Sequence, residues 1–205
     1  MDVKMLNSAL GNADLILIDQ ILKNRFHKQM KILDAGCGEG RNMVYFIKND
    51  FRIYGIDANV DAIRLAKLYC RSLNNTFEVE NIQNFAIEQN PFPDHFFDAI
   101  ICLNVLHSAK NQNDFFLWFK QLFRMLHSRG FLLLSLQSQI GVSQNHQQDD
   151  PNGRNNMGNE NFYLLTENVL QEILKLDFLK TIENTKTILI DNKKSHTYLF
   201  LERSD

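Results

Sequence analysis

Three glycines and two carboxylates lie together in residues 34–40, which read Asp-Ala-Gly-Cys-Gly-Glu-Gly. The glycines tolerate backbone angles that other residues avoid, and they let a ligand approach the main chain closely. An apolar run precedes this turn and a helical pattern follows it, so the first N–H groups of a helix would point toward the same spot. The pattern predicts a nucleoside-cofactor site at the carboxyl end of a strand.

The spacing and charge of this turn separate the candidate cofactors. A dinucleotide fingerprint needs glycine or alanine where Arg41 stands, and the Gly-Lys-Ser/Thr of a Walker loop is absent. Asp34 and Glu39 would repel a pyrophosphate, but they would favour a ligand that carries a sulfonium and an ammonium group. The turn therefore predicts S-adenosylmethionine as the cofactor, with S-adenosylhomocysteine as its product.

A further carboxylate ends the next strand-like run, residues 52–57. Asp57 comes 17 positions after Gly40, where an acid can accept hydrogen bonds from both ribose hydroxyls. An aspartate at a strand end is otherwise a helix cap or a solvated loop residue. Its position after the glycine turn favours the ribose role, with Ala58 beside it.

Strand and helix patterns alternate around these residues. Apolar spacing predicts helices over 12–28, 60–73, about 114–126 and 166–176. Strands are expected over 31–35, 52–57, 77–80, 97–103 and 131–136, and the run 97–103 is apolar enough to be covered on both faces. Runs near 179–190 and 197–202, separated by Asp-Asn-Lys-Lys, predict an antiparallel hairpin. The alternation indicates a parallel α/β sheet.

Two segments fall outside this alternation. Residues 1–29 form an N-terminal helical segment, and residues 137–161 form a long loop rich in Gln, Asn, Asp and Gly. A loop of that length in a compact domain is typically a lid, a binding loop or disordered. We expect this loop and the segment 10–14 to close over the acceptor. We find no domain boundary, which predicts one domain over 1–205.

Over residues 30–137 the chain resembles the class I S-adenosylmethionine-dependent methyltransferases. The first motif of that family matches residues 34–40, and Tyr54-Gly-Ile-Asp57 resembles the second. Residues 97–107 resemble the motif of the fourth strand, and Arg129-Gly130 the turn before the fifth. The resemblance implies a Rossmann-like three-layer sandwich with a mostly parallel seven-stranded sheet and an antiparallel last strand.

The resemblance also implies roles for single residues. Asn81 and Ile82 fall where the family has the acid that meets the adenine amino group, and the side-chain oxygen of Asn81 can accept the same bond. Leu103 and Asn104 would border the methyl group, with His107 as the candidate general base. The cofactor cradle would comprise Asp34, Ala35, Gly36, Gly38 and Gly40.

Other reactive residue types have a structural explanation that we favour. Cys37 suits packing beneath the turn, and Cys70 and Cys102 suit the core. The Phe-rich stretch 115–123 has the spacing of a buried helix face rather than of a base-stacking platform. His146, Asp149 and Asp150 resemble solvated loop residues rather than metal ligands, so no metal is predicted.

The composition limits the kinds of partner that we expect for this protein. The 205 residues carry a formal net charge of −2, with 44% hydrophobic and 22% charged residues. This balance gives no broad attraction to nucleic acid or to acidic membranes. The scattered cysteines, the missing signal-peptide pattern and the short apolar runs favour a cytoplasmic protein. We expect a monomer or weak dimer.

Three functions remain as hypotheses. The leading hypothesis is a methyltransferase that acts on a small-molecule acceptor. The second is an RNA or protein methyltransferase, although Leu103-Asn104-Val105-Leu106 stands where an N-P-P-Y type motif would methylate amide or amino nitrogens. The third is a non-catalytic protein that binds S-adenosylmethionine and acts through partner contacts.

Overall fold

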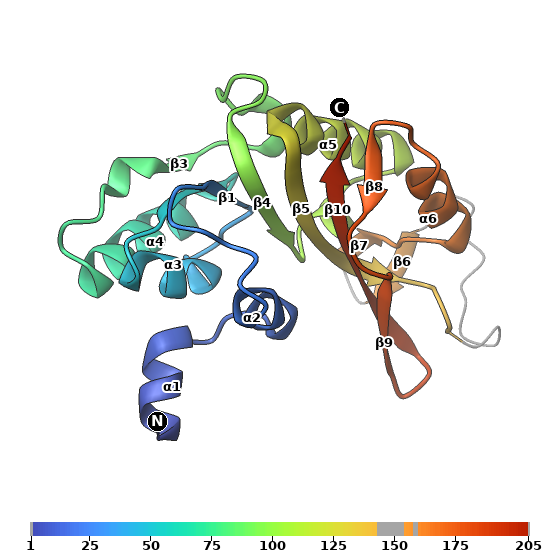
Figure 1. The fold of residues 1–205 in the computed structure, drawn as a ribbon. Helices are drawn as coiled ribbons and strands as arrows, with labels where there is room; N and C mark the ends of the chain where they lie inside the picture. Colours follow the sequence, from blue (N-terminus) through green and yellow to red (C-terminus); the bar gives the residue numbers. More distant parts are fainter. Residues whose placement is uncertain (1, 143–153, 158–159, 205) are drawn as a thin grey trace.

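An eight-stranded sheet runs through the residues that the computed structural model describes, 2–142, 154–157 and 160–204 (Figure 1). The order is β3-β2-β1-β4-β5-β10-β8, and β9 also pairs with β10. The first five strands of this order are parallel, whereas β10 is antiparallel to β5, β8 and β9. The strands are β1 (Lys31–Ala35), β2 (Arg52–Asp57), β3 (Ile82–Asn84), β4 (Phe97–Leu103), β5 (Leu126–Ser138), β8 (Leu179–Thr181), β9 (Lys186–Ile190) and β10 (Lys194–Arg203).

Helices cover both faces of the sheet and make three layers. Apolar side chains of α2, α3 and α4 pack on one face, and those of α5 and α6 pack on the other. The helices are α1 (Val3–Leu10), α2 (Leu15–Leu22), α3 (Val44–Lys48), α4 (Val60–Leu73), α5 (Gln112–Met125) and α6 (Glu167–Leu174). None of the helices in the described ranges is long and apolar enough to cross a membrane.

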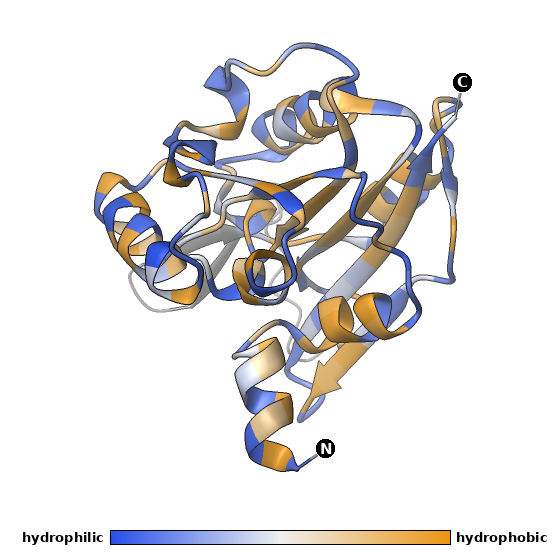
Figure 2. Cartoon of the chain, turned by 60° about the vertical axis from the view of Figure 1, so that its left-hand side comes forward, coloured by the Kyte–Doolittle hydropathy of each residue, from blue (hydrophilic) through white to orange (hydrophobic). Residues whose placement is uncertain are grey.

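The predicted α/β class, mostly parallel sheet and antiparallel last strand are confirmed. The sheet has one strand more than the predicted seven because the run 179–190 is divided. Leu179–Thr181 pairs with the end of β10, and Lys186–Ile190 pairs with its beginning. Strand β4 is buried almost throughout, as the run 97–103 predicted, and the central strands are strongly apolar (Figure 2).

The third strand lies later in the chain than the sequence predicts. Residues 77–80 were expected to form it, but Val79–Asn81 is a 3-10 turn and β3 begins at Ile82. The register pairs Ile82 with Gly55 of β2, which leaves Asn81 at the amino end of the strands. A three-residue strand carries too little apolar periodicity to fix its position from sequence.

The two segments outside the regular alternation differ from their predicted structure. Asp14 caps α2 by accepting a hydrogen bond from the Ile16 N–H at 2.9 Å, and α2 ends at Leu22, so the predicted helix 12–28 is too long. In the predicted loop 137–161, β6 (Arg154–Met157) pairs with β7 (Glu160–Tyr163) in an antiparallel hairpin. His146, Asp149 and Asp150 lie outside the described residues.

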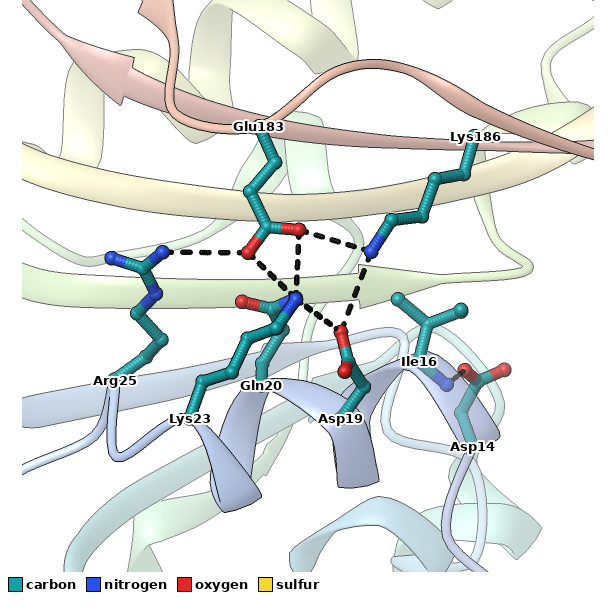
Figure 3. Close-up of polar contacts among 8 residues, drawn as sticks. All are labelled: Asp14, Ile16, Asp19, Gln20, Lys23, Arg25, Glu183 and Lys186. Atoms are coloured by element: carbon teal, nitrogen blue, oxygen red, sulfur yellow. Dashed lines mark hydrogen bonds and ion pairs between the residues drawn. The ribbon is translucent and has the colours of Figure 1, made fainter.

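Ion pairs join α2 to the segment before β9 (Figure 3). Glu183 lies 3.0 Å from the Lys23 ammonium, 2.9 Å from that of Lys186 and 3.4 Å from the Arg25 guanidinium. Asp19 also pairs with Lys23, at 2.7 Å. Partial burial opposes ionisation of Glu183, but the hydrogen bonds from Lys186 and Lys23 prevail and lower its pKa to about 2.

Candidate functional site

The glycine turn joins β1 to the 3-10 turn Arg41–Met43 and is fastened to the neighbouring strand. The N–H groups of Gly36 and Cys37 donate to the Ile56 carbonyl at 2.8 and 2.9 Å. All three glycines have positive φ, namely 78° at Gly36, 53° at Gly38 and 87° at Gly40. Residues other than glycine rarely adopt these angles, so the turn depends on its composition.

The three glycines have different surroundings. A Cβ atom on Gly36 would lie 2.3 Å from a methyl group of Val105, and one on Gly40 would lie 3.1 Å from the sulfur of Cys70. A Cβ atom on Gly38 would meet no atom within 4 Å. Gly36 and Gly40 are therefore needed for packing within the protein, whereas Gly38 keeps the backbone accessible from outside.

Asp57 connects the turn to the next helix. Its two carboxylate oxygens accept hydrogen bonds from the N–H of Gly38 at 2.9 Å and from the N–H of Asn59, the N-cap residue of α4, at 2.8 Å. Each carboxylate oxygen can accept a second bond, so Asp57 retains capacity for ligand hydroxyls. The side chain of Asn84, at the end of β3, donates to the Asp57 carbonyl at 2.8 Å.

A cavity of about 440 Å³ lies at the carboxyl ends of these strands, and we call it the strand-end cavity. Five predicted site residues line it: Gly36, Gly38, Asp57, Ala58 and Asn104. Asn104 has a φ of 62°, and its N–H donates to the Ser135 carbonyl at 3.0 Å, which fixes the chain as it leaves β4. The structure therefore brings together residues that are up to 68 positions apart (104 minus 36).

Four other predicted residues do not line the cavity but are buried next to residues that do. Ala35 and Leu103 are buried at the ends of β1 and β4, and Gly40 packs against α4. Asp34 is only 1% exposed, and its Oδ2 atom has no hydrogen-bond partner among the described residues. Burial, with a smaller contribution from the Asp57 charge, raises the pKa of Asp34 to about 7 although Arg41 opposes the shift.

The expected positions of Asn81 and Ile82 require correction. Ile82 is fully buried, and Asn81 lines a different cavity together with Asp50, Arg52 and Asn74. Because β3 runs parallel to β2, Asn81 at its start lies at the opposite edge of the sheet from Asp57 at the end of β2. The residues of this segment that line the strand-end cavity come after β3.

Seven residues that line the strand-end cavity were not predicted from the sequence. Phe85, Ala86, Ile87 and Glu88 follow β3, Val105 and Ser108 follow β4, and Trp118 comes from α5. The Glu88 Oε2 atom is buried without a hydrogen-bond partner among the described residues. The residues 85–88 would have been identified if β3 had been placed correctly. The end of β3 lies beside Asp57, at the same edge of the sheet as the strand-end cavity.

His107 lies between Val105 and Ser108, both of which line the strand-end cavity. Burial lowers the pKa of His107 to about 4, with a further contribution from the charge of His196. The imidazole is therefore neutral near pH 7, the protonation state that a general base requires. Its catalytic role remains a prediction.

The cysteines and the Phe-rich helix agree with the structural explanation. Cys37, Cys70 and Cys102 are buried, and burial raises the pKa of each thiol, which disfavours the nucleophilic thiolate. Phe115, Phe119 and Phe123 are buried in the core, as predicted. Within the described ranges, no three His, Cys, Asp or Glu residues form a group that could hold a metal ion.

The site has the features that a nucleoside cofactor with a positive centre needs. Gly38 leaves the backbone accessible, and Asp57 can accept further hydrogen bonds. The rest of the lining combines apolar side chains, such as Phe85 and Trp118, with polar ones, such as Glu88. The unpartnered oxygen of Asp34 lies beneath the turn, where an ammonium or sulfonium group would compensate its charge.

Known proteins match this chain in sequence and in fold. Residues 26–186 match the family described as "Methyltransferase domain". The chain is 26% identical over 114 residues to YqeM of Bacillus subtilis, a protein provisionally named a methyltransferase, and the match covers 56% of this chain and 45% of YqeM. It is 29% identical over 94 residues to the ubiquinone biosynthesis O-methyltransferase of Rickettsia akari, covering 46% of this chain and 36% of that enzyme. The chain thus matches less than half the length of these relatives.

A solved structure, a SAM-dependent methyltransferase from Methanosarcina mazei, has the same fold. Its TM-score is 0.71 at 21% identity, and the alignment covers 90% of this chain and 97% of that one.

Proposed function

The chain belongs to the methyltransferase-domain family, and on this premise we propose that it binds S-adenosylmethionine in the strand-end cavity and transfers the methyl group to a small-molecule acceptor. The observation that carries the proposal is the glycine turn, in which Gly38 faces open space and its N–H is bonded to Asp57. The glycine turn and the Asp57 carboxylate together suit a ribose that lies against the backbone.

Each part of the proposed site has a separate task. Asp57 accepts bonds from the ribose, and Phe85, Ala86 and Glu88 border the adenine in place of Asn81. Asp34 stabilises the positive end of the cofactor, which it does in its ionised form. When bound, the cofactor supplies a methyl group already activated by its sulfonium, so the protein needs chiefly to align the acceptor and exclude water.

Support for a small-molecule acceptor comes from the sequence and from relatives. No N-P-P-Y type motif follows β4, and the formal net charge of −2 gives no general attraction to RNA. One relative is named a 2-heptyl-1-hydroxyquinolin-4(1H)-one methyltransferase, and it is 46% identical to this chain over 57 residues, 26% of this chain and 25% of that enzyme.

Methyl-labelled cofactor tests the proposal. The purified protein is incubated with it and with separate pools of small hydroxyl, amino and thiol compounds, RNA and protein, and S-adenosylhomocysteine release is measured. We expect release with a small-molecule pool, and none with the Gly38→Val variant. Labelling of RNA or protein alone would contradict the proposed acceptor class. If none of the pools leads to S-adenosylhomocysteine release, the proposed activity is contradicted.

A further inference from the structure

Polar side chains of β10 interrupt an otherwise apolar sheet face. Alternation along the strand places His196 and Tyr198 on the same face as Phe200, which belongs to the apolar cluster under α2, α3 and α4. In the register, Tyr198 lies opposite Ser135, and Ser135 lies opposite Leu103 at the end of β4. This row therefore leads from β10 toward the edge that holds the strand-end cavity.

Two residues of α2, Ile16 and Gln20, line a small pocket together with Tyr198. Asp14, the N-cap of α2, is only 8% exposed, and its N–H donates to the side-chain oxygen of Asn42 at 3.0 Å, just after the glycine turn. Burial, together with the Asp14 carboxylate, raises the pKa of Tyr198 to about 12, although Arg41 opposes the shift. Tyr198 is therefore protonated near pH 7, and its phenol oxygen can accept a hydrogen bond.

His196 lies beside Tyr198, with 5.0 Å between the ring centroids. Its Nε2 atom is buried and has no hydrogen-bond partner among the described residues. Burial lowers the pKa of His196 although Asp14 opposes the shift, so the ring is neutral near pH 7. The charge of His196 also lowers the pKa of His107, which lies in the chain between Val105 and Ser108, and both of these residues line the strand-end cavity.

We call Asp14, His107, His196 and Tyr198 the acceptor cluster. Resting on the function proposed above, we propose that this cluster binds a neutral acceptor through its hydroxyl group and that His196 Nε2 receives the hydroxyl proton. The cluster offers a carboxylate, a phenol oxygen and an unpartnered imidazole nitrogen, so it suits a ligand that donates hydrogen bonds.

The chemistry of methyl transfer favours a hydroxyl over other acceptors. A neutral oxygen is a poor nucleophile unless a base removes its proton, whereas an uncharged amine already has a reactive lone pair. An anionic acceptor would bind more weakly than a neutral one beside the Asp14 carboxylate, although it needs no base. As the acceptor oxygen bonds to the methyl carbon, the bond from that carbon to sulfur breaks, its electron pair stays on sulfur, and the hydroxyl proton passes to His196.

The ion pairs of Glu183 hold this arrangement together. They fasten α2, which carries Asp14, to the segment that leads into β9 and thus to β10, which carries His196 and Tyr198 (Figure 3). Two parts of the cluster that lie more than 180 residues apart in sequence are thereby joined near each other in space.

Acceptors of similar size but different acidity test the inference. The wild type, His196→Gln and the matched exposed-residue control His127→Gln are assayed with phenol, 4-nitrophenol, aniline and thiophenol at about pH 8.5, where phenol is largely protonated and 4-nitrophenol is already ionised. We expect the wild type to methylate phenol in preference to aniline and thiophenol. His196→Gln should lower kcat/KM at least about 100-fold for phenol but less than about fivefold for 4-nitrophenol.

Binding measurements make the result independent of turnover. Calorimetry of phenol added to the protein saturated with S-adenosylhomocysteine should show about threefold to tenfold weaker binding in Tyr198→Phe, while S-adenosylhomocysteine binds all variants within about twofold of the wild type. Equal losses for both phenols in His196→Gln, preference for aniline or thiophenol, or no methylation of any phenol would overturn the inference. Failure to bind S-adenosylhomocysteine would instead overturn the proposed function.

Discussion

The two sides of the site are built in different ways. On the cofactor side, backbone hydrogen bonds fasten one turn of seven residues to the end of β2 and fix the geometry of Gly38 and Asp57. On the acceptor side, Asp14, His107 and His196 come from the start of α2, the loop after β4 and the last strand. The first side depends on local backbone conformation, whereas the second depends on the docking of a helix and the register of a strand.

This difference determines how substitutions should act. Changes in the glycine turn alter backbone atoms and should affect cofactor affinity or the fold itself. Changes in the acceptor cluster remove single side-chain atoms and should leave cofactor affinity almost unchanged. The substitutions below test that division, in order of decreasing expected effect.

Gly38→Val should have the largest effect on binding. Its side chain would occupy the open space against the turn, and its β-branched backbone disfavours a φ of 53°. We expect S-adenosylhomocysteine to bind at least about 100-fold more weakly, which corresponds to about 3 kcal/mol. Calorimetry measures the loss, and circular dichroism checks that the fold persists. Affinity within tenfold of the wild type would contradict the assigned role of Gly38.

Gly36→Ala should lower the stability of the fold rather than block the approach of the cofactor to the backbone. Its Cβ would lie 2.3 Å from a Val105 methyl group, and its φ is 78°. We expect the free energy of unfolding to fall by about 2–3 kcal/mol, as overpacking of a tight contact does. Denaturant unfolding measures it, and the double variant with Val105→Ala should recover part of the loss. Gly38→Ala, which meets no neighbour, is the matched control and should cost less.

Asp57→Ala should weaken S-adenosylhomocysteine binding by about 2 kcal/mol, or about 30-fold, because it removes charged hydrogen-bond acceptors. The same change frees the Gly38 and Asn59 N–H groups, so a smaller loss of stability should accompany it. Asp61→Ala, an exposed residue in the first turn of α4, serves as the control. An unchanged dissociation constant in Asp57→Ala would refute the ribose assignment.

Asp34 should make cofactor affinity depend on pH. Burial raises its pKa from 3.8 to about 7, so its carboxylate is increasingly protonated as pH falls below about 7. We expect binding of S-adenosylhomocysteine to weaken about tenfold between about pH 8 and pH 6, and to become almost independent of pH in Asp34→Asn. The raised pKa also means that Asp34 stabilises the free protein at low pH and loses this contribution as pH rises through about 7. Calorimetric titrations with S-adenosylhomocysteine across pH, in two buffers, test the first expectation. Denaturant unfolding of the free protein across the same pH range tests the second.

Glu183→Gln should have the smallest effect. It weakens partly exposed ion pairs, so we expect a loss of at most about 1 kcal/mol in unfolding free energy and no change beyond twofold in S-adenosylhomocysteine affinity. The lowered pKa of Glu183 means that the contribution is present above about pH 4.5 and is lost as pH falls toward 2. A large loss of cofactor affinity would show that the two sides of the site are coupled.

The same division explains what the sequence could predict. The glycine turn and Asp57 were identified because their conformation and spacing are encoded in adjacent residues. The third strand and Asn81 were misplaced because β3 has only three residues, and its register with β2 depends on tertiary packing. His196 and Tyr198 carried no signal of their own, since their neighbours on β5 and α2 are fixed only when the sheet is complete.

Calorimetric titration of the wild-type protein with S-adenosylmethionine and S-adenosylhomocysteine, with NADH as the control, tests the central claim most directly. The glycine turn with Asp34 and Asp57 predicts one site per chain, with micromolar dissociation constants for both compounds and no measurable binding of NADH. Binding of NADH, or of none of the three, would contradict the assignment of the strand-end cavity to S-adenosylmethionine.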